Sequence, residues 1–208
     1  MKFLADPRAI EARSMELVEE LLRPWEGSFT PEELRVVKRV VHTTGDPKCA
    51  GELVFRNAPV AAGIAALHRR ATLICDVKMV AAGIRARLPE GVASRVAVEE
   101  PGVAEEAARQ KVTRALAGVR RLRKVLPGSI VAVGNAPTAL FGVLELYGAG
   151  MRPALVIGTP VGFVGAAEAK EALLATGLPA IVLRGTRGGS AVAAAVVNAL
   201  AALAVEKG

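Results

Sequence analysis

Aromatic residues are scarce in this 208-residue chain and make up only 3% of it. Proteins that hold single-stranded nucleic acid use aromatic side chains as stacking platforms. The composition therefore argues against that class, and no arginine-rich tail or familiar nucleic-acid motif is present. The formal net charge of +7 nevertheless indicates an acidic partner. Charge alone leaves nucleic acid, anionic lipid and a polycarboxylate ligand open.

Cysteine is also rare, and the two cysteines, Cys49 and Cys75, exclude a disulfide framework. No group of His, Cys and carboxylate residues has the spacing of a metal site. The N-terminal segment lacks the apolar core of a signal peptide, so we expect a cytoplasmic protein. The most membrane-like stretch, residues 190–205, is short, rich in alanine and interrupted by Asn198. A buried helix or a dimer-interface helix is the better interpretation.

The familiar cofactor-binding signatures are missing as well. No G-x-G-x-x-G follows a predicted strand, which weakens a dinucleotide-binding interpretation, and the absence of G-x-x-x-x-G-K-[ST] excludes an ordinary P-loop. There is no G-x-S-x-G nucleophile elbow. The glycine-rich loops of this chain therefore need another ligand.

Short apolar runs alternate with helical patterns from residue 71 onward, which is typical of an α/β protein. The predicted strands are "ATLICDV", "SRVAVEE", "GSIVAVGN", "RPALVIGT" and "LPAIVLRG". Each is followed by a predicted helix, the longest running from about residue 101 to 126. Five such units predict a doubly wound, five-stranded parallel sheet with helices on both faces. We treat residues 1–208 as one domain, with an N-terminal helical part (1–70) and a sheet part (71–208).

Two helices are predicted before the sheet. The first begins after Asp6 as N-cap, and its apolar stripe comprises Ile10, Leu17, Val18 and Leu21. The second begins with the capping box of Thr30 and Glu33 and ends at Gly45. Its packing stripe comprises Leu34, Val37 and Val41, while Arg35, Arg39 and His42 follow another face.

Three side chains on these helices are candidates for chemistry. Arg39 and His42 are three residues apart, so they share a helix face. The pair is either a solvated arginine beside a helix-end histidine favoured by the dipole, or an anion clamp beside a proton donor. Ser14 lies within the stripe of the first helix, where it is either a tolerated polar residue or an inward-facing contact.

In open α/β sheets, ligands bind outside the carboxyl ends of the strands. Asp76 ends the first predicted strand, where it is either functional or a cap for the next helix. Three glycine-containing loops follow later strands, at residues 134–138, 158–165 and 184–190. Glycine lets a backbone approach a ligand closely, and the helix N-termini that follow favour anions.

Several strings together resemble one known family. "EARSM", "RVVHTTGD", "ICDVKMVAAGI", "GNAPTALF", "PVGFVGAAEAK" and "RGGSA" occur in the order and at the positions found in precorrin-8X methylmutases. The resemblance spans almost the whole chain and implies a flavodoxin-like fold. It also implies an isomerase of cobalamin biosynthesis that moves the C-11 methyl group of a tetrapyrrole to C-12, giving hydrogenobyrinate or, with cobalt, cobyrinate. No cofactor is implied.

The resemblance also assigns roles to residues. It makes His42 the acid/base residue and places Ser14 and Arg39 in contact with the substrate. Further expected substrate contacts are Arg13, Asp76, Thr113, Arg114, Asn135, Gly188 and Gly189. The family pocket is shared between subunits, so a homodimer is expected. The chain departs from the family at Met15, where phenylalanine is usual, and in "GIRARLP", which is one residue shorter than in some members.

Two rival functions stay open. One is a non-catalytic tetrapyrrole carrier that uses the same pocket, and the other is a nucleic-acid-binding module that exploits the charge of +7. The expected partner of the isomerase is a polycarboxylate tetrapyrrole, with neither nucleic acid nor membrane involved. The sequence leaves open whether the substrate carries cobalt.

Overall fold

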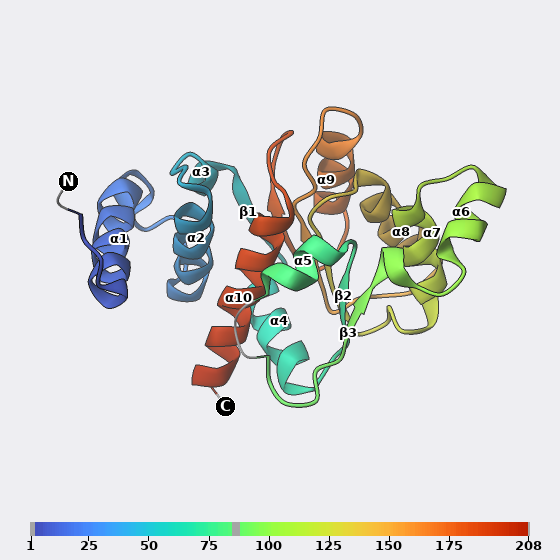
Figure 1. Ribbon diagram of the computed structural model, residues 1–208, viewed down its shortest axis with the longest axis horizontal. Helices are drawn as coiled ribbons and strands as arrows, with labels where there is room; N and C mark the ends of the chain where they lie inside the picture. The colour runs from blue at the N-terminus through green and yellow to red at the C-terminus, as the bar shows by residue number, and fades with distance from the viewer. Residues whose placement is uncertain (1–2, 85–87, 208) are drawn as a thin grey trace.

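The computed structural model describes residues 3–84 and 88–207, which form one sheet covered by helices on both faces (Figure 1). The strands are β1 (Leu53–Arg56), β2 (Leu73–Cys75), β3 (Ser94–Val96), β4 (Ile130–Val133), β5 (Leu155–Gly158) and β6 (Ala180–Leu183). The α-helices are α1 (Pro7–Leu22), α2 (Pro31–Thr44), α3 (Cys49–Glu52), α4 (Pro59–His68), α5 (Lys78–Gly83), α6 (Val103–Gln110), α7 (Arg114–Arg121), α8 (Pro137–Gly148), α9 (Ala166–Leu174) and α10 (Ser190–Glu206). The 3-10 turns are η1 (Arg23–Trp25), η2 (Ala97–Glu99) and η3 (Leu122–Lys124).

The strands lie in the order β1-β6-β5-β4-β2-β3. The five strands expected from the sequence are present and mutually parallel. The sheet is nevertheless mixed, because β1 pairs antiparallel with β6, with Leu53 opposite Leu183. The prediction of a five-stranded, wholly parallel sheet is therefore wrong. The extra strand is only four residues long and lies within the part of the chain expected to be helical.

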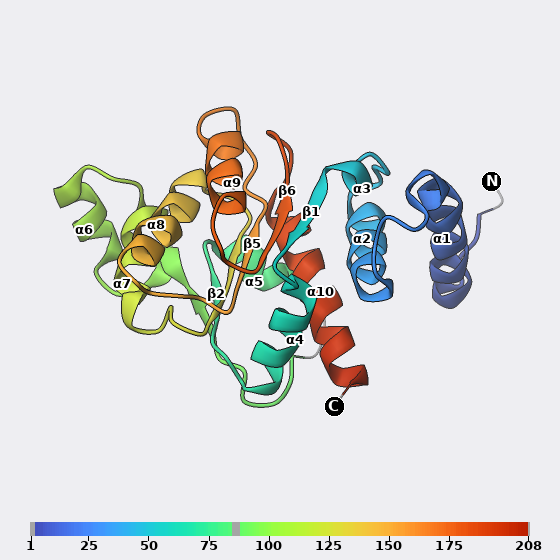
Figure 2. The same ribbon diagram turned by 180° about the vertical axis from the view of Figure 1, so that it is seen from behind.

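Successive side chains of a strand point to opposite faces of the sheet, so the sheet packs against two separate hydrophobic cores. In β4, Ile130 and Ala132 face the core formed with α4, α5 and α10, while Val131 and Val133 face the core formed with α7, α8 and α9. Figures 1 and 2 show these helix groups on opposite faces of the sheet. Strands buried on both faces explain the continuous apolar runs in the sequence.

The N-terminal helices extend the layer on the α10 side. α2 packs against α10, and α1 packs against the outer side of α2 (Figures 1 and 2). Because α2 is covered on two sides, it buries the four valines Val36, Val37, Val40 and Val41. α1 buries only Val18 and Leu22. The predicted stripe of α1 is therefore only partly buried, and its other members are 42–49% exposed, namely Ile10, Leu17 and Leu21.

The predicted long helix from residue 101 to 126 is wrong, because the chain breaks it into α6, α7 and η3. Lys111 takes a left-handed conformation with φ of 52° and ends α6. Thr113 then caps α7 by accepting a hydrogen bond from the Leu116 N–H. The helix predicted over residues 78–88 begins as α5, and residues 85–87 of the "GIRARLP" segment lie outside the described residues.

The alanine-rich stretch at residues 190–205 forms α10, whose side chains are buried along most of its length. The interpretation as a buried helix is therefore confirmed. Asn198 lies near its middle with 6% exposure. Across residues 3–84 and 88–207, no helix is both long enough and apolar enough to span a bilayer.

Candidate active site

The last turns of α2 present Arg39 and His42. The capping box of Thr30 and Glu33 fixes the start of the helix, and Gly45 ends it in a left-handed conformation with φ of 65°. The buried valines fix the rotation of α2 about its axis. Arg39 and His42 therefore point away from the core toward a groove beside α10, as their spacing predicts.

The groove lies between three helices and encloses about 350 Å³. Its walls are Arg39, His42 and Thr43 of α2, Gly83 of α5, and Ala191, Ala194, Ala195 and Asn198 of α10. Small residues on α10 leave room for the two longer side chains of α2. The Asn198 side chain donates a hydrogen bond to the Gly83 carbonyl at 3.0 Å, which ties α10 to the end of α5.

A second hollow of about 260 Å³ continues from this groove, since Arg39 and Asn198 border both. Its remaining walls are Glu11, Met15, Arg35, Lys38, Ala199 and Ala202. Arg35 is paired with Glu206 at 2.6 Å and Lys38 with Glu19 at 2.5 Å. Arg39, in contrast, has no carboxylate partner among the described residues. Its charge is therefore available to an anionic ligand.

His42 is exposed and forms no hydrogen bond with another described residue. The other histidine, His68, lies at the end of α4, where its Nε2 is 2.8 Å from the Ala204 carbonyl oxygen of α10. His68 therefore joins two helices, whereas the ring of His42 is accessible from the groove. His42 is the histidine that can exchange a proton with a bound molecule.

Helix α1 lines the second hollow with Glu11 and Met15, and not with the predicted Ser14 and Arg13. The Ser14 hydroxyl donates to the Ile10 carbonyl at 2.8 Å, and Arg13 pairs with Glu16 at 2.8 Å on the exposed side of α1. Neither lines the groove. Met15, the residue that departs from the family pattern, does line the second hollow. Substrate contacts by Ser14 and Arg13 stay predictions.

Asp76 is buried at the end of β2, with 1% exposure. Its carboxylate accepts hydrogen bonds from four main-chain N–H groups, at 2.8–3.1 Å, namely those of Val77, Gly134, Asn135 and Ala136. Burial raises the pKa of the Asp76 carboxyl, and the four N–H donors act in the opposite direction. Asp76 therefore shapes the loop between β4 and α8. No wall of the groove includes it, and its contact with substrate stays a prediction.

Thr113, Arg114 and Asn135 lie at the other end of α5 from the groove. The Thr113 hydroxyl is 2.6 Å from that of Thr138, and Arg114 donates to the Val98 carbonyl at 3.0 Å. Arg114 borders an open depression of about 660 Å³, which the start of α5 also lines. Asn135 is exposed in the β4–α8 loop. Of the predicted site residues, Arg39 and His42 line the groove at the end of α5, and Arg114 borders the depression at its start.

The loop between β6 and α10 requires its glycines. Gly188 has φ of 151°, and a Cβ built on it would lie 2.2 Å from the Thr159 carbonyl oxygen. The Gly189 N–H donates to the same oxygen at 2.8 Å. These two glycines therefore let the loop pass close to the end of β5, and α10 starts directly after them.

Sequence reasoning missed Lys170 of α9, which binds the backbone of this loop through its side chain. Its side chain is fully buried, and its Nζ donates to the carbonyls of Gly185 at 2.8 Å and Arg187 at 2.6 Å. Burial lowers the pKa of Lys170 to about 8, and the charge of Glu52 acts against that shift. The available signal was a lysine near the start of an alanine-rich helix, in "GAAEAK".

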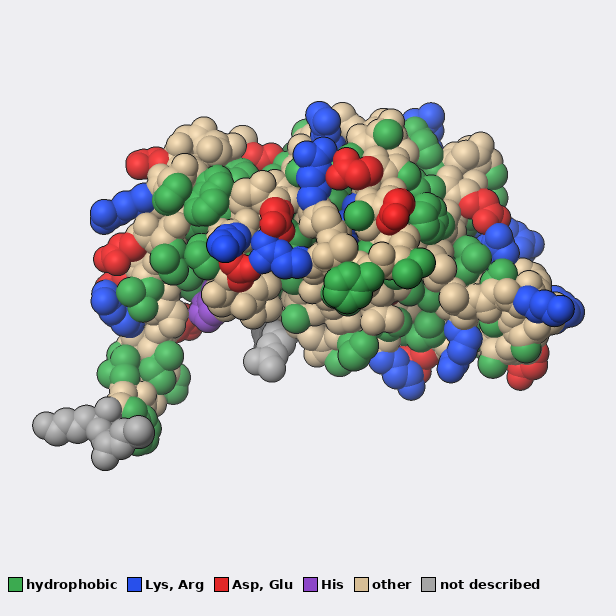
Figure 3. Space-filling model, turned by 90° about the horizontal axis from the view of Figure 1, so that it is seen from above, with side chains coloured by type: hydrophobic (Ala, Val, Ile, Leu, Met, Phe, Trp, Pro, Cys, Tyr) green, Lys and Arg blue, Asp and Glu red, His purple; other side chains and the backbone are tan. Residues whose placement is uncertain are grey.

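Figure 3 shows the side of the molecule that carries the loops after β5 and β6. Lys and Arg side chains alternate there with Asp and Glu, and hydrophobic side chains are exposed among them. The β5–α9 loop supplies three exposed apolar residues, Val161 (46%), Phe163 (94%) and Val164 (89%). In the described ranges, no group of three or more His, Cys, Asp or Glu residues could hold a metal ion.

The fold is that of an α/β protein, and its groove combines an accessible histidine with an arginine that has no ion-pair partner among the described residues. Comparison with known proteins is more specific. The sequence model of the precorrin-8X methylmutase family matches residues 9–203. The chain belongs to the precorrin-8X methylmutase family, and the isomerase class expected from the sequence is confirmed.

Named relatives cover most of the chain. A precorrin-8X methylmutase of Pseudomonas aeruginosa is 46% identical over 80% of this chain and 82% of its own. A cobalt-precorrin-8 methylmutase of Methanocaldococcus jannaschii is 39% identical over 90% of this chain and 87% of its own. The crystal structure of precorrin-8X methylmutase from Thermus thermophilus superposes with a TM-score of 0.86 at 38% identity, and covers 96% of this chain and 99% of its own.

Proposed function

We propose that this chain catalyses the migration of the C-11 methyl group to C-12 of precorrin-8X or cobalt-precorrin-8, with His42 as the acid/base residue. The observation that carries the assignment of the site is the position of His42 beside Arg39 in one groove. Among the described residues, neither side chain has an ion-pair partner. Both are therefore free to act on a ligand.

The reaction is an internal rearrangement. The bond from the methyl carbon to C-11 breaks as its bond to C-12 forms, and no atom or electron is exchanged with another reagent. His42 donates a proton to a ring nitrogen, which polarises the conjugated system, and recovers that proton when the shift is complete. Imidazole suits this role because its ordinary pKa lies near working pH.

Arg39 binds a carboxylate of the substrate in this proposal. The tetrapyrrole carries several acetate and propionate groups, and a guanidinium can hold one of them through two parallel hydrogen bonds. A macrocycle held in one orientation keeps its reacting carbons aligned and presents its ring nitrogen to His42. Ser14, Arg13, Thr113, Arg114, Asn135, Gly188 and Gly189 complete the set of proposed contacts, with Asp76 supporting the loop of Asn135.

A substrate of this size needs more room than the groove at Arg39. We infer that a second copy of the chain completes the site, which is supported by the exposed apolar residues of α1 and of the β5–α9 loop. Sedimentation of the purified chain tests the homodimer. We also infer that the five parallel strands are a flavodoxin-like core with β1 added, and that the protein works in the cytoplasm.

Incubating the purified protein with each substrate tests the proposed function. An absorption spectrum follows the change in the chromophore, and NMR of a methyl-labelled substrate locates the methyl group. The proposal predicts transfer to C-12 in at least one of the two substrates. A protein that binds both substrates but leaves the methyl group at C-11 would be the non-catalytic carrier.

A further inference from the structure

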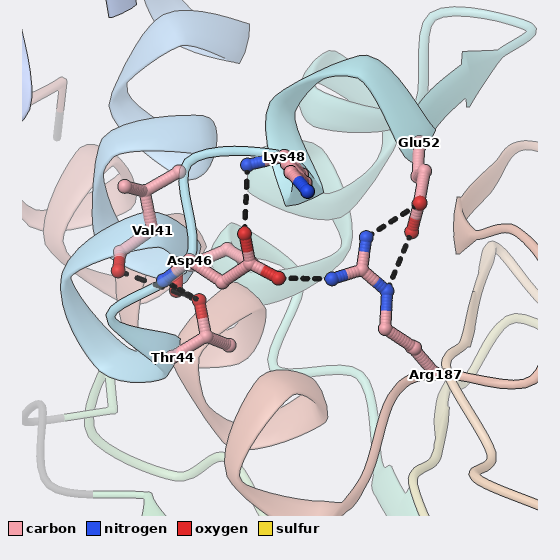
Figure 4. Close-up of polar contacts among 7 residues, drawn as sticks. Val41, Thr44, Asp46, Lys48, Glu52 and Arg187 are labelled. Atoms are coloured by element: carbon pink, nitrogen blue, oxygen red, sulfur yellow. Dashed lines mark hydrogen bonds and ion pairs between the residues drawn. The ribbon is translucent and has the colours of Figure 1, made fainter. Parts of the chain in front are cut away.

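Arg187 pairs with two carboxylates that lie 141 and 135 positions earlier in the sequence (Figure 4). Its guanidinium pairs with Asp46, which follows α2, through Nη1. It also pairs with Glu52, at the junction of α3 and β1, through Nε at 3.2 Å and Nη2 at 2.5 Å. Arg187 itself lies in the loop between β6 and α10. All of its charge is thus directed to carboxylates of the protein, in contrast to that of Arg39.

Asp46 is closely joined to the end of the helix that carries His42. Its N–H donates to the Thr44 hydroxyl at 3.3 Å, and the Gly45 N–H donates to the Val41 carbonyl at 2.9 Å. The second carboxylate oxygen of Asp46 accepts the Lys48 N–H at 2.9 Å. Figure 4 shows these contacts as one connected set. A contact that fixes the Asp46 carboxylate therefore also restrains the final turn of α2.

The backbone of Arg187 is held just before α10, the helix that forms the opposite wall of the groove. Its carbonyl accepts a hydrogen bond from the buried Lys170 ammonium at 2.6 Å. Two residues later, the Gly189 N–H donates to the Thr159 carbonyl, and α10 starts immediately after. Arg187 therefore links the end of α2 to the start of α10, the two helices that face each other across the groove.

Few apolar contacts hold the final turn of α2. The four residues from His42 to Gly45 are exposed, and the last buried side chain of the helix is Val41. A turn without buried side chains frays readily. A guanidinium that faces two carboxylates, one of them through two hydrogen bonds, has a defined geometry that a single surface ion pair lacks. The contact of Arg187 with Asp46 therefore adds a side-chain anchor directly after this turn.

We propose that Arg187 is a positioning residue that holds His42 in register with the α10 wall of the groove. This inference rests on the proposed function, because it assumes that the orientation of His42 affects turnover. Arg187 itself touches no substrate in this proposal. Its replacement should therefore lower kcat through His42 and leave KM nearly unchanged.

The test compares Arg187→Met and Arg187→Lys with the wild-type protein. Loss of orientation predicts a roughly ten- to hundredfold lower kcat for Arg187→Met, with KM within about twofold. Lysine keeps the charge but loses the two-pronged pairing with Glu52, so it should rescue kcat only in part. Arg120→Met is the matched control, because Arg120 also pairs with a carboxylate, Glu145, but lies on α7. Its kcat should equal that of the wild type.

A measurement independent of activity follows the helix end directly. Amide hydrogen exchange of residues 42–46 should be faster in Arg187→Met and unchanged in Arg120→Met. The ring signals of His42 should shift in NMR, and they are readily assigned in a chain with two histidines. If Arg187→Met does not fold, Asp46→Asn breaks the same contact while keeping an acceptor for the Lys48 N–H.

Each outcome has one interpretation. Wild-type kcat in Arg187→Met, or reduced kcat with unchanged exchange and unchanged His42 signals, would overturn the positioning role. Full activity of His42→Ala would instead overturn the proposed function. In that case the exchange result would still report whether Arg187 holds the end of α2.

Discussion

The carboxylate of Asp76 accepts the main-chain N–H groups of Asn135 and of its neighbour Ala136, both at 2.8 Å. This contact joins the end of β2 to the loop after β4, the adjacent strand of the sheet. The loop contains "GNAPT", one of the strings that resemble the family. A single buried carboxylate therefore determines the conformation of a family motif at the carboxyl edge of the sheet.

Replacing Asp76 by asparagine should destabilise the protein by about 1–3 kcal/mol. The amide keeps the size of the side chain but offers one acceptor oxygen to four N–H donors. Urea unfolding followed by circular dichroism measures the loss. Asp6→Asn is the control, because asparagine caps a helix as well as aspartate does, so the free energy of unfolding should barely change. Equal stability of the two variants would show that the loop does not depend on the carboxylate.

Lys170 should make stability depend on pH in the alkaline range. Its pKa is about 8 in the folded protein and 10.5 in the reference state of an unfolded chain. Between these values the unfolded chain holds the proton that the folded protein has lost, so raising the pH favours folding. The free energy of unfolding should rise by up to about 3 kcal/mol across this window. Lys170→Met should remove this rise. Subtracting its free energy of unfolding from that of the wild type at each pH removes the contribution of the other titrating groups. Parallel pH profiles for the wild type and Lys170→Met would contradict the lowered pKa.

Arg39→Ala should weaken substrate binding roughly 10- to 100-fold, since a charged hydrogen bond is lost. The clamp acts in both the ground state and the transition state, so kcat at saturation should change little. Lysine at this position should restore only part of the affinity, because it keeps the charge without the bidentate fork. Arg35→Ala is a useful comparison, because Arg35 is already paired with Glu206. Its effect on binding should be smaller. An unchanged dissociation constant for Arg39→Ala, measured by fluorescence or absorption titration, would refute the clamp.

Local sequence signals predicted those parts of the fold that depend on local physics. The caps at Asp6 and Thr30 and the left-handed Gly45 lie where the sequence places them. The five parallel strands were also recognisable, because strands buried on both faces leave continuous apolar runs. The shared face of Arg39 and His42 follows from helical spacing alone.

The remaining features depend on partners distant in the sequence. β1 is a four-residue strand that exists because β6 pairs with it, and its own sequence shows no extended alternation. The break before α7 requires a left-handed Lys111, which local propensity does not favour. Lysine is ordinarily exposed, and only the carbonyls of Gly185 and Arg187 make the burial of Lys170 possible. The candidate site was predictable only in part for the same reason, because helical spacing does not reveal that Arg187 pairs with the distant Asp46.

Single-turnover rates of the wild type and His42→Ala on the same substrate test the central claim most directly. His42 has no protein partner in the described part of the chain and faces the groove, so alanine should leave folding and substrate binding intact. Loss of a general acid predicts a methyl-shift rate roughly 10²- to 10⁴-fold lower, with the dissociation constant within a few-fold of the wild type. His68→Gln, a change at the other histidine, should retain the wild-type rate. A His42→Ala protein that moves the methyl group to C-12 at the wild-type rate would contradict the account.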